Sequence, residues 1–268
     1  MPQLTITPSA PGIGAEISGV DLREPLTPAL CDEFRRLLFR HRVVFWRDQH
    51  LGTAQQVAFA HALGTILEFS SVVDADPAAP GVHQVRGSTL GWHVDASSLP
   101  EPPVATMLRA VDVPPAGGDT IWADGVAAYR DLPEQLKQQV AGRYLAHGLP
   151  RHFSDPGFDR PMVAHRLVRT HPATGEQHLY LNNSLPCSII GMSQEASDEL
   201  LATLAQEYLR PEHQLRFQWS PGAIAMWDNR VVQHTGTHDY GEYPRHLVRI
   251  CLADFHPTTK AENGARRP

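Results

Sequence analysis

The sequence predicts either an α+β protein or a mainly β antiparallel barrel or sandwich with helical decoration. Helical patterns concentrate in the first half of the chain and strand-like runs in the second, with no regular alternation between them. That order disfavours a doubly wound parallel sheet. The chain also has 23 prolines and 20 glycines among 268 residues, and its apolar runs are short. This composition favours strands and structured loops over a helical bundle.

The N-terminal quarter of the chain predicts short strands and two helices. Residues 3–20 fit two strands around a Pro/Gly turn. Apolar positions then recur at helical spacing over 28–42, and the β-branched and aromatic run 42–48 predicts a strand. We expect Thr53 to be the N-cap of a second helix that ends at Gly64.

Two loop-rich segments interrupt the middle of the chain. Residues 65–92 mix Ser, Asp, Pro and Gly, which indicates either a disordered excursion or a mobile lid over a site. Strand patterns resume at 104–113 and 119–124, and helical patterns cover roughly 125–141. The second loop-rich segment, 149–163, is the other candidate lid.

The C-terminal half predicts mostly strands. A hairpin is expected at 165–183, and Ser193 should cap a helix that ends near Tyr208. No linker divides the chain, so we expect a single domain over 1–268 with a frayed tail at about 258–268. Three strand-like runs complete the pattern, at 215–220, 223–228 and 246–255.

Charge and cysteine content exclude several classes of protein. The chain has 23 basic and 29 acidic residues, a net charge of −6, which argues against a nucleic-acid binder. Cys31, Cys187 and Cys251 are far apart and odd in number, so a disulfide framework or a thiolate zinc site is not expected. A reducing, cytoplasmic location fits best. Neither a secretory signal nor a membrane-spanning stretch is recognisable, so no membrane partner is expected.

Histidines and carboxylates at ligand spacing indicate a metal site. His93 and Asp95 are separated by one residue, and on a strand such positions share a face. Because the chain has 15 histidines, this pair alone carries little weight and could be a solvated pair at a strand end. His234 follows the apolar run 223–228 and would complete two imidazoles and one carboxylate. That set leaves three open positions on an octahedral Fe(II).

Arg245 and Arg249 follow His234 in a predicted strand. If the strand covers 246–253, both guanidinium groups can face one cavity. An arginine binds a carboxylate through two parallel hydrogen bonds. Two anions beside the metal, a co-substrate and a substrate, are one interpretation; structural ion pairs are the other.

The order of these motifs resembles one known family. HxD, then GGDTIWAD, then WDNRVVQH, then an arginine about ten residues on, is similar to the taurine dioxygenase / 2,4-dichlorophenoxyacetate dioxygenase (TauD/TfdA) family. The resemblance covers nearly the whole chain, from IGAEISGVDLREPL to ICLADF. It implies a double-stranded β-helix (jelly-roll) core flanked by helices, Fe(II) and 2-oxoglutarate as cofactor and co-substrate, O2 as oxidant, and a dimer or tetramer.

The resemblance also assigns roles to single residues. His93, Asp95 and His234 correspond to the iron ligands. Thr120 in GGDT and Arg245 correspond to the pair that binds the distal carboxylate of 2-oxoglutarate, and a hydroxyl with an arginine fork supplies suitable donors.

Substrate-reading positions depart from the taurine enzyme. Arg249 corresponds to the residue that holds the sulfonate, but the family's sulfonate-binding histidine falls at Phe69. An asparagine expected before the first iron ligand is Thr89. Both changes remove polar contacts, so we expect a small organic anion other than taurine.

Together with these residues, the resemblance implies a dioxygenase that hydroxylates an unactivated C–H of a small anionic organic molecule and releases succinate and CO2. C–S or C–O cleavage follows where the hydroxylated carbon bears a sulfonate, sulfate ester or aryl ether oxygen. The alternative is a non-redox cupin-type metalloenzyme, an isomerase or hydrolase with the same His/Asp/His site. Arg245 and Thr120 have no purpose in that alternative. A binding module with a relic site is disfavoured by the intact triad.

Overall fold

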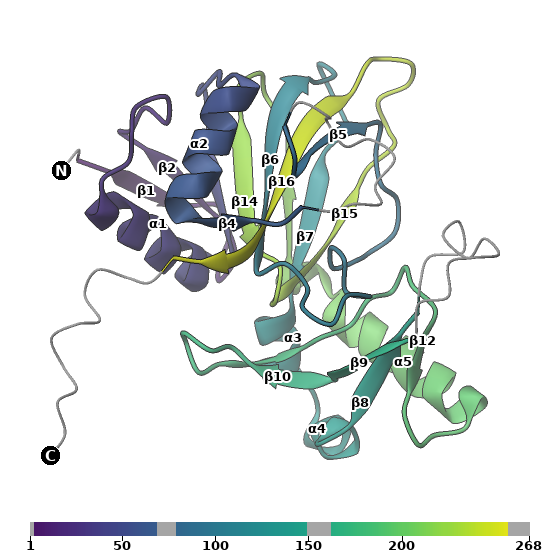
Figure 1. The fold of residues 1–268 in the computed structure, drawn as a ribbon. Coiled ribbons are helices and arrows are strands. Elements are labelled where there is room, and N and C mark those ends of the chain that lie inside the picture. Colours follow the sequence, from purple (N-terminus) through teal and green to yellow (C-terminus); the bar gives the residue numbers. More distant parts are fainter. Residues whose placement is uncertain (1–2, 69–78, 149–161, 257–268) are drawn as a thin grey trace, which may run out of the picture.

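The structure is a computed structural model that describes residues 3–68, 79–148 and 162–256. Figure 1 shows a sandwich of two β-sheets with a smaller group of elements at one end. We call this smaller group, the helices and strands between residues 125 and 208, the accessory layer. None of the helices within the described ranges is long and apolar enough to cross a membrane.

The larger sheet is antiparallel except where β2 pairs with β3. Its strands follow the order β1 (Thr5–Pro8), β2 (Ala15–Ser18), β3 (Val43–Trp46), β14 (Ile224–Asp228), β6 (Ala105–Asp112), β16 (His246–Phe255) and β4 (Gly64–Ile66), and β5 (Val82–Arg86) also pairs with β16.

The smaller sheet faces the larger one and contains β13 (Gln214–Phe217), β7 (Thr120–Asp124) and β15 (Val232–Gly236), in that order. The central strands of the larger sheet are buried on both faces. On β14, Ala225 and Trp227 pack between the two sheets, whereas Ile224 and Met226 pack toward the helices. This alternation follows from the two-residue period of a strand. The expected mainly β jelly-roll core with flanking helices is confirmed.

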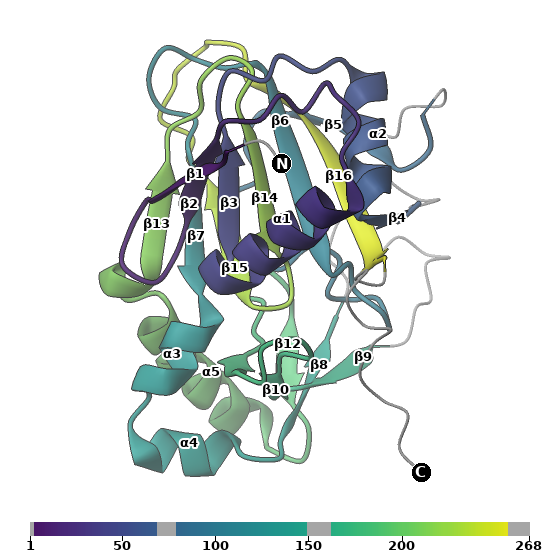
Figure 2. The ribbon, with the colours of Figure 1, turned by 90° about the vertical axis from the view of Figure 1, so that its left-hand side faces the viewer.

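Two helices cover the outer face of the larger sheet, α1 (Pro28–His41) and α2 (Thr53–Leu63), as Figure 2 shows. Phe34 of α1 and Phe59 of α2 are buried and meet edge to edge at a ring-centroid distance of 6.2 Å. The expected cap at Thr53 is wrong by one residue. Gly52 is the N-cap, and its backbone N–H donates to the Gln55 side chain at 2.8 Å.

The accessory layer contains α3 (Gly125–Asp131), α4 (Glu134–Val140), α5 (Gln194–Tyr208), a sheet of β12 (Cys187–Ile189), β8 (Tyr144–His147) and β9 (Val163–Arg166), and a hairpin of β10 (Val168–Thr170) and β11 (Gln177–Leu179). Ser193 caps α5 as expected, and its hydroxyl accepts from the Ala196 N–H at 3.3 Å. The accessory layer has an apolar cluster of its own, in which Leu145, Leu179 and Leu204 are buried.

Several expected boundaries are wrong, each for a local reason. The helical pattern over 125–141 divides into α3 and α4, because Pro133 cannot continue a helix. The segment 65–92 is not a single loop: β4 and β5 lie within or beside it, and both pair with β16. The rest of that segment at 69–78, most of the second expected lid at 149–161, and the tail from 257 lie outside the described residues.

Candidate active site

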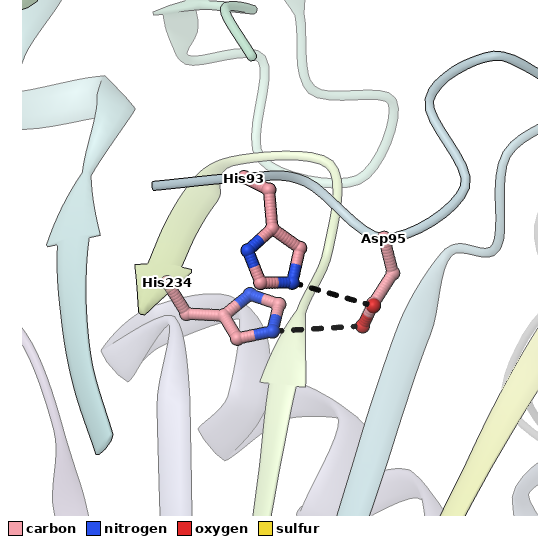
Figure 3. A group of neighbouring side chains, drawn as sticks. All are labelled: His93, Asp95 and His234. Carbon is pink, nitrogen blue, oxygen red and sulfur yellow. Dashed lines mark ion pairs between the residues drawn. The ribbon is translucent and has the colours of Figure 1, made fainter. Parts of the chain in front are cut away.

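Three side chains from distant parts of the chain meet at the end of the sandwich (Figure 3). The Nε2 atoms of His93 and His234 lie 3.9 and 3.8 Å from the two carboxylate oxygens of Asp95. All three ligand atoms fit within 4.8 Å of one another. The structure therefore brings together the three residues that the sequence singled out.

The backbone holds the two histidines side by side. The N–H of each donates to the carbonyl of the other, at 3.0 Å from His93 and 2.9 Å from His234. His234 lies on β15, a strand that was not expected, because its apolar run is short and follows a turn directly. The two ring centroids lie 4.1 Å apart.

Hydrogen bonding and burial prepare both imidazoles to bind a cation. Nδ1 of His93 lies 2.9 Å from the Gly91 carbonyl, which can only accept, so Nδ1 carries the proton and the lone pair is on Nε2. His234 is buried against the ring of Trp227 at 4.6 Å. Burial lowers the pKa of His234 to about 3, which keeps this imidazole neutral at ordinary pH.

Asp95 supplies a buried negative charge. Burial alone would raise its pKa, but the neighbouring Arg249 guanidinium outweighs burial and lowers the pKa of Asp95 to about 2. Oδ1 accepts a hydrogen bond from Nη1 of Arg249 at 3.0 Å. Within the described part of the chain, the buried Oδ2 has no hydrogen-bond partner. An ionised oxygen without a donor, facing two imidazole nitrogens, suits a divalent cation.

The backbone of Asp95 is held by Asn229, which is fully buried directly after β14. The Asp95 N–H donates to Oδ1 of Asn229 at 3.0 Å, and Nδ2 of Asn229 donates to the Asp95 carbonyl at 3.0 Å. Sequence reasoning assigned Asn229 no role. Its place in WDNRVVQH, between an apolar strand and the metal-ligand candidate His234, could have indicated a role at the site.

The other end of the site is built on Arg245, which is only 6% exposed. Its Nε and Nη1 donate to the carbonyls of Gly118 and Gly87 at 2.7 and 2.6 Å, and Nη2 donates to Oγ1 of Thr120 at 3.4 Å. No carboxylate within the described ranges forms an ion pair with it. Burial lowers the pKa of Arg245. A buried guanidinium fixed in this way suits an anionic ligand.

Thr120 lies on β7 beside this arginine, and its hydroxyl is polarised from a second side. Nε1 of Trp219 donates to Oγ1 of Thr120 at 3.0 Å. Because Oγ1 accepts from both neighbours, its own hydrogen is available to donate to a ligand. Trp219 was not expected at the site; it follows β13, which pairs with β7.

One cavity joins the two ends. It is lined by His93 and His234 of the metal site, by Thr120 and Arg245, and by Arg249, which pairs with Asp95. The expectation that both arginines face one cavity therefore agrees with the structure. Thr89 lines the cavity as an exposed residue, whereas Phe69 lies outside the described residues.

The chain is similar to characterised enzymes over most of its length. A family model described as "Taurine catabolism dioxygenase TauD, TfdA family" matches residues 5–251. An alpha-ketoglutarate-dependent sulfate ester dioxygenase from Pseudomonas putida is 34% identical, covering 94% of this chain and 90% of the relative. An alpha-ketoglutarate-dependent 2,4-dichlorophenoxyacetate dioxygenase from Cupriavidus pinatubonensis is 31% identical, covering 92% of this chain and 96% of the relative.

Solved structures agree. A structure described as a putative alpha-ketoglutarate-dependent taurine dioxygenase from Burkholderia xenovorans has a TM-score of 0.84 at 38% identity, covering 93% of this chain and 92% of its own. AAD-2 in complex with Mn(II) and N-oxalylglycine has a TM-score of 0.82 at 29% identity, covering 96% and 99%. Sequence, fold and site geometry lead to one conclusion: the chain belongs to the TauD/TfdA family of dioxygenases.

Proposed function

We propose that this chain is an Fe(II)- and 2-oxoglutarate-dependent dioxygenase that hydroxylates a C–H of a small organic anion and releases succinate and CO2. One observation carries the proposal. A single cavity is lined by His93 and His234, which lie against the buried Asp95 carboxylate, and by Arg245, which has no carboxylate partner among the described residues. A non-redox metalloenzyme needs the metal site but has no use for the arginine, so that alternative is not favoured.

At the metal end, Nε2 of His93, Nε2 of His234 and the Asp95 carboxylate would hold Fe(II). Their charges fit, because Asp95 is ionised and His234 is neutral. Iron with 2-oxoglutarate would supply the oxygen-activating chemistry when bound, and the protein would supply the position of the reacting groups.

At the other end, Arg245 and Thr120 would orient 2-oxoglutarate by its distal carboxylate. The arginine is held by two backbone carbonyls and the threonine by Trp219. Such donors need no rearrangement when the ligand arrives, which reduces the entropic cost of ordering them.

We further propose that Arg249 binds the anionic group of the substrate and that Thr89 and Phe69 contribute to the substrate wall. Arg249 lines the cavity and already pairs with one carboxylate, that of Asp95. The matched relatives include a sulfate ester dioxygenase, an alkylsulfatase and a 2,4-dichlorophenoxyacetate dioxygenase, names that share an anionic substrate. Alkyl sulfates and aryloxyalkanoates are therefore the first compounds to test.

The experiment has two stages. Fe(II) and 2-oxoglutarate, added without oxygen, should give a weak visible charge-transfer band that a His93→Ala variant lacks. Succinate formation and oxygen uptake are then measured with each candidate anion. If the band is absent from the wild-type protein, or unchanged in the variant, the proposal is wrong.

Location and assembly remain predictions. We propose a cytoplasmic protein that forms a dimer or tetramer. The location is proposed from the cysteine content, because three distant cysteines, Cys31, Cys187 and Cys251, do not suggest a disulfide framework. Light scattering coupled to size-exclusion chromatography measures the mass in solution, and a monomer would contradict the assembly.

A further inference from the structure

We propose that the accessory layer positions the carboxylate of Asp95 through three buried side chains, His147, His165 and Asn182. This inference rests on the proposed function, because it takes Asp95 as a metal ligand. None of the three touches the metal site itself. Each instead holds the turn at residues 94–99, on which Asp95 lies.

The turn requires support because its backbone is strained. Ala96, the residue after Asp95, has φ of +50°, in the left-handed region that side chains other than glycine adopt at a cost. That cost is roughly 1–2 kcal/mol. The turn is closed by a hydrogen bond from the Leu99 N–H to the Ala96 carbonyl at 3.0 Å. Strain of this kind persists only where surrounding contacts determine the conformation.

Asn182 forms hydrogen bonds with the turn at two points. Its Nδ2 donates to the Val94 carbonyl at 3.1 Å and to the Ser97 hydroxyl at 2.8 Å. Its Oδ1 accepts from the Ser184 N–H at 3.1 Å, which fixes the orientation of the amide. The side chain is therefore fully hydrogen-bonded, and its contacts lie on both sides of Asp95 in the chain.

Two histidines from strands of the accessory layer also contact the turn. Nε2 of His165 lies 2.9 Å from the Ser97 carbonyl and 3.2 Å from that of Leu99. Carbonyls only accept, so the His165 proton is on Nε2 and is shared between them. Nδ1 of His147 lies 3.0 Å from the Ser97 hydroxyl. His147 and His165 are on β8 and β9, which are paired strands.

Asn229 holds the same turn from the sandwich side. The turn is thus fixed between the two parts of the molecule, by Asn229 on one side and by Asn182, His147 and His165 on the other. Removing the accessory-layer contacts should leave Asp95 in place on average but allow its carboxylate to move. Support residues of this kind typically change metal affinity 10- to 100-fold.

The test uses His165→Leu, Asn182→Ala and a matched control, His178→Leu. His178 is another buried imidazole of the accessory layer, 1% exposed, and its ring nitrogen lies 3.4 Å from the neighbouring Leu179 carbonyl. The control therefore removes a buried imidazole without removing a hydrogen bond to the turn. Binding of Co(II) alone is measured by titration, together with the melting temperature.

We expect His165→Leu and Asn182→Ala to weaken Co(II) binding about tenfold. The Co(II) affinity of His178→Leu should stay within threefold of the wild-type value, even if its melting temperature falls as far as those of His165→Leu and Asn182→Ala. His165→Gln should recover most of the affinity, because a Gln amide can donate from a position close to that of Nε2. Ser97→Ala, a smaller change that keeps the fold, should weaken binding three- to fivefold.

Two results separate this inference from the proposed function. If Co(II) binding is equal in the wild type, His165→Leu, Asn182→Ala and Ser97→Ala, the contacts are only structural and the inference is wrong. If the wild type fails to bind Co(II), or His93→Ala binds it equally well, the metal site itself is wrong and the inference falls with it.

Discussion

The two ends of the cavity are constructed differently. At the metal end, Oδ2 of Asp95 has no hydrogen-bond partner among the residues that the structure describes, although Oδ1 accepts from Arg249. At the anion end, Arg245 and Thr120 are engaged by backbone carbonyls and by Trp219. A cation needs lone pairs that are not already used. An anion needs donors whose direction is fixed. Each end is therefore prepared for one sign of charge.

The ends also differ in what holds them. The metal end depends on contacts between segments far apart in the sequence, such as the backbone pairing of His93 with His234. The anion end depends on side-chain donation from Arg245 to the Gly118 and Gly87 carbonyls and on the pairing of β7, which carries Thr120, with β13. Substitutions at one end should therefore have little effect on binding at the other, and the following experiments test that separation.

The largest effect is expected at the metal end. His234→Ala removes one of two imidazoles, and we expect metal affinity to fall by more than 100-fold and turnover to become undetectable. Calorimetric titration with Co(II) and a succinate assay measure the two effects. Arg245→Lys is the matched control and should bind Co(II) within threefold of the wild type. Loss of Co(II) binding in that control would contradict the separation.

Arg245 should give the next largest effect. In Arg245→Leu the buried cation is lost, and we expect the KM for 2-oxoglutarate to rise about 100-fold, equivalent to about 3 kcal/mol. Arg245→Lys keeps the positive charge but loses the paired donors of the guanidinium group, so its KM for 2-oxoglutarate should lie between those of the wild type and Arg245→Leu. Steady-state kinetics with 2-oxoglutarate as the varied ligand measure this change. An unchanged KM would remove Arg245 from the co-substrate site.

Acid should destabilise the fold through buried histidines, which lie in the accessory layer and, as His234, at the metal end, but not at the anion end. Burial lowers the pKa of both His147 and His178 to about 3, so each stays neutral in the folded protein. Unfolded histidine has a pKa near 6.5, so the unfolded state binds more protons as pH falls below that value. Stability is therefore complete above pH 6.5 and decreases toward pH 3, by about 2 kcal/mol for each imidazole at pH 5.

Urea unfolding of the metal-free protein at pH 7, 6 and 5 measures this slope. His178→Gln should show a shallower pH dependence because one titrating group is removed. The free energy of unfolding of Arg245→Lys should change with pH as it does in the wild type, since an arginine and a lysine both stay charged in this range. Equal slopes for wild type and His178→Gln would show that His178 is not a source of the acid sensitivity.

The smallest expected effect is at Thr120. Thr120→Val preserves the shape of the side chain but removes one donor, so we expect the KM for 2-oxoglutarate to rise about five- to tenfold, or roughly 1 kcal/mol. Trp219→Phe removes only the polarising N–H and should raise KM less. The same kinetic assay checks both. A larger effect for Trp219→Phe than for Thr120→Val would mean that the tryptophan acts through packing.

Much of the fold was predictable because long periodic segments carry a strong signal. Residues 28–41 form the helix expected over 28–42, and residues 246–255 form the expected strand. Short elements were missed: β8 and β12 have four and three residues, too few for a period to be visible. Their existence depends on packing across the accessory layer rather than on local propensity.

The candidate site, like the fold, could be predicted only in part from the sequence. His93, Asp95 and His234 were predictable as residue types at ligand spacing, and the structure brings them together. Asn229, Asn182 and Trp219 were not identified, because an amide or an indole has no distinctive spacing and acts only through a partner far along the chain. Such residues become visible only when the topology is known.

The reciprocal backbone pairing of His93 and His234 has a consequence for how the enzyme is loaded. In a zinc finger the ion organises its own ligands, so stripping the metal unfolds the protein. Here the two imidazoles are already neighbours through main-chain bonds that the ion does not make. We therefore expect the metal-free protein to keep these two ligands paired, so that iron lost to a chelator can be replaced without refolding the site.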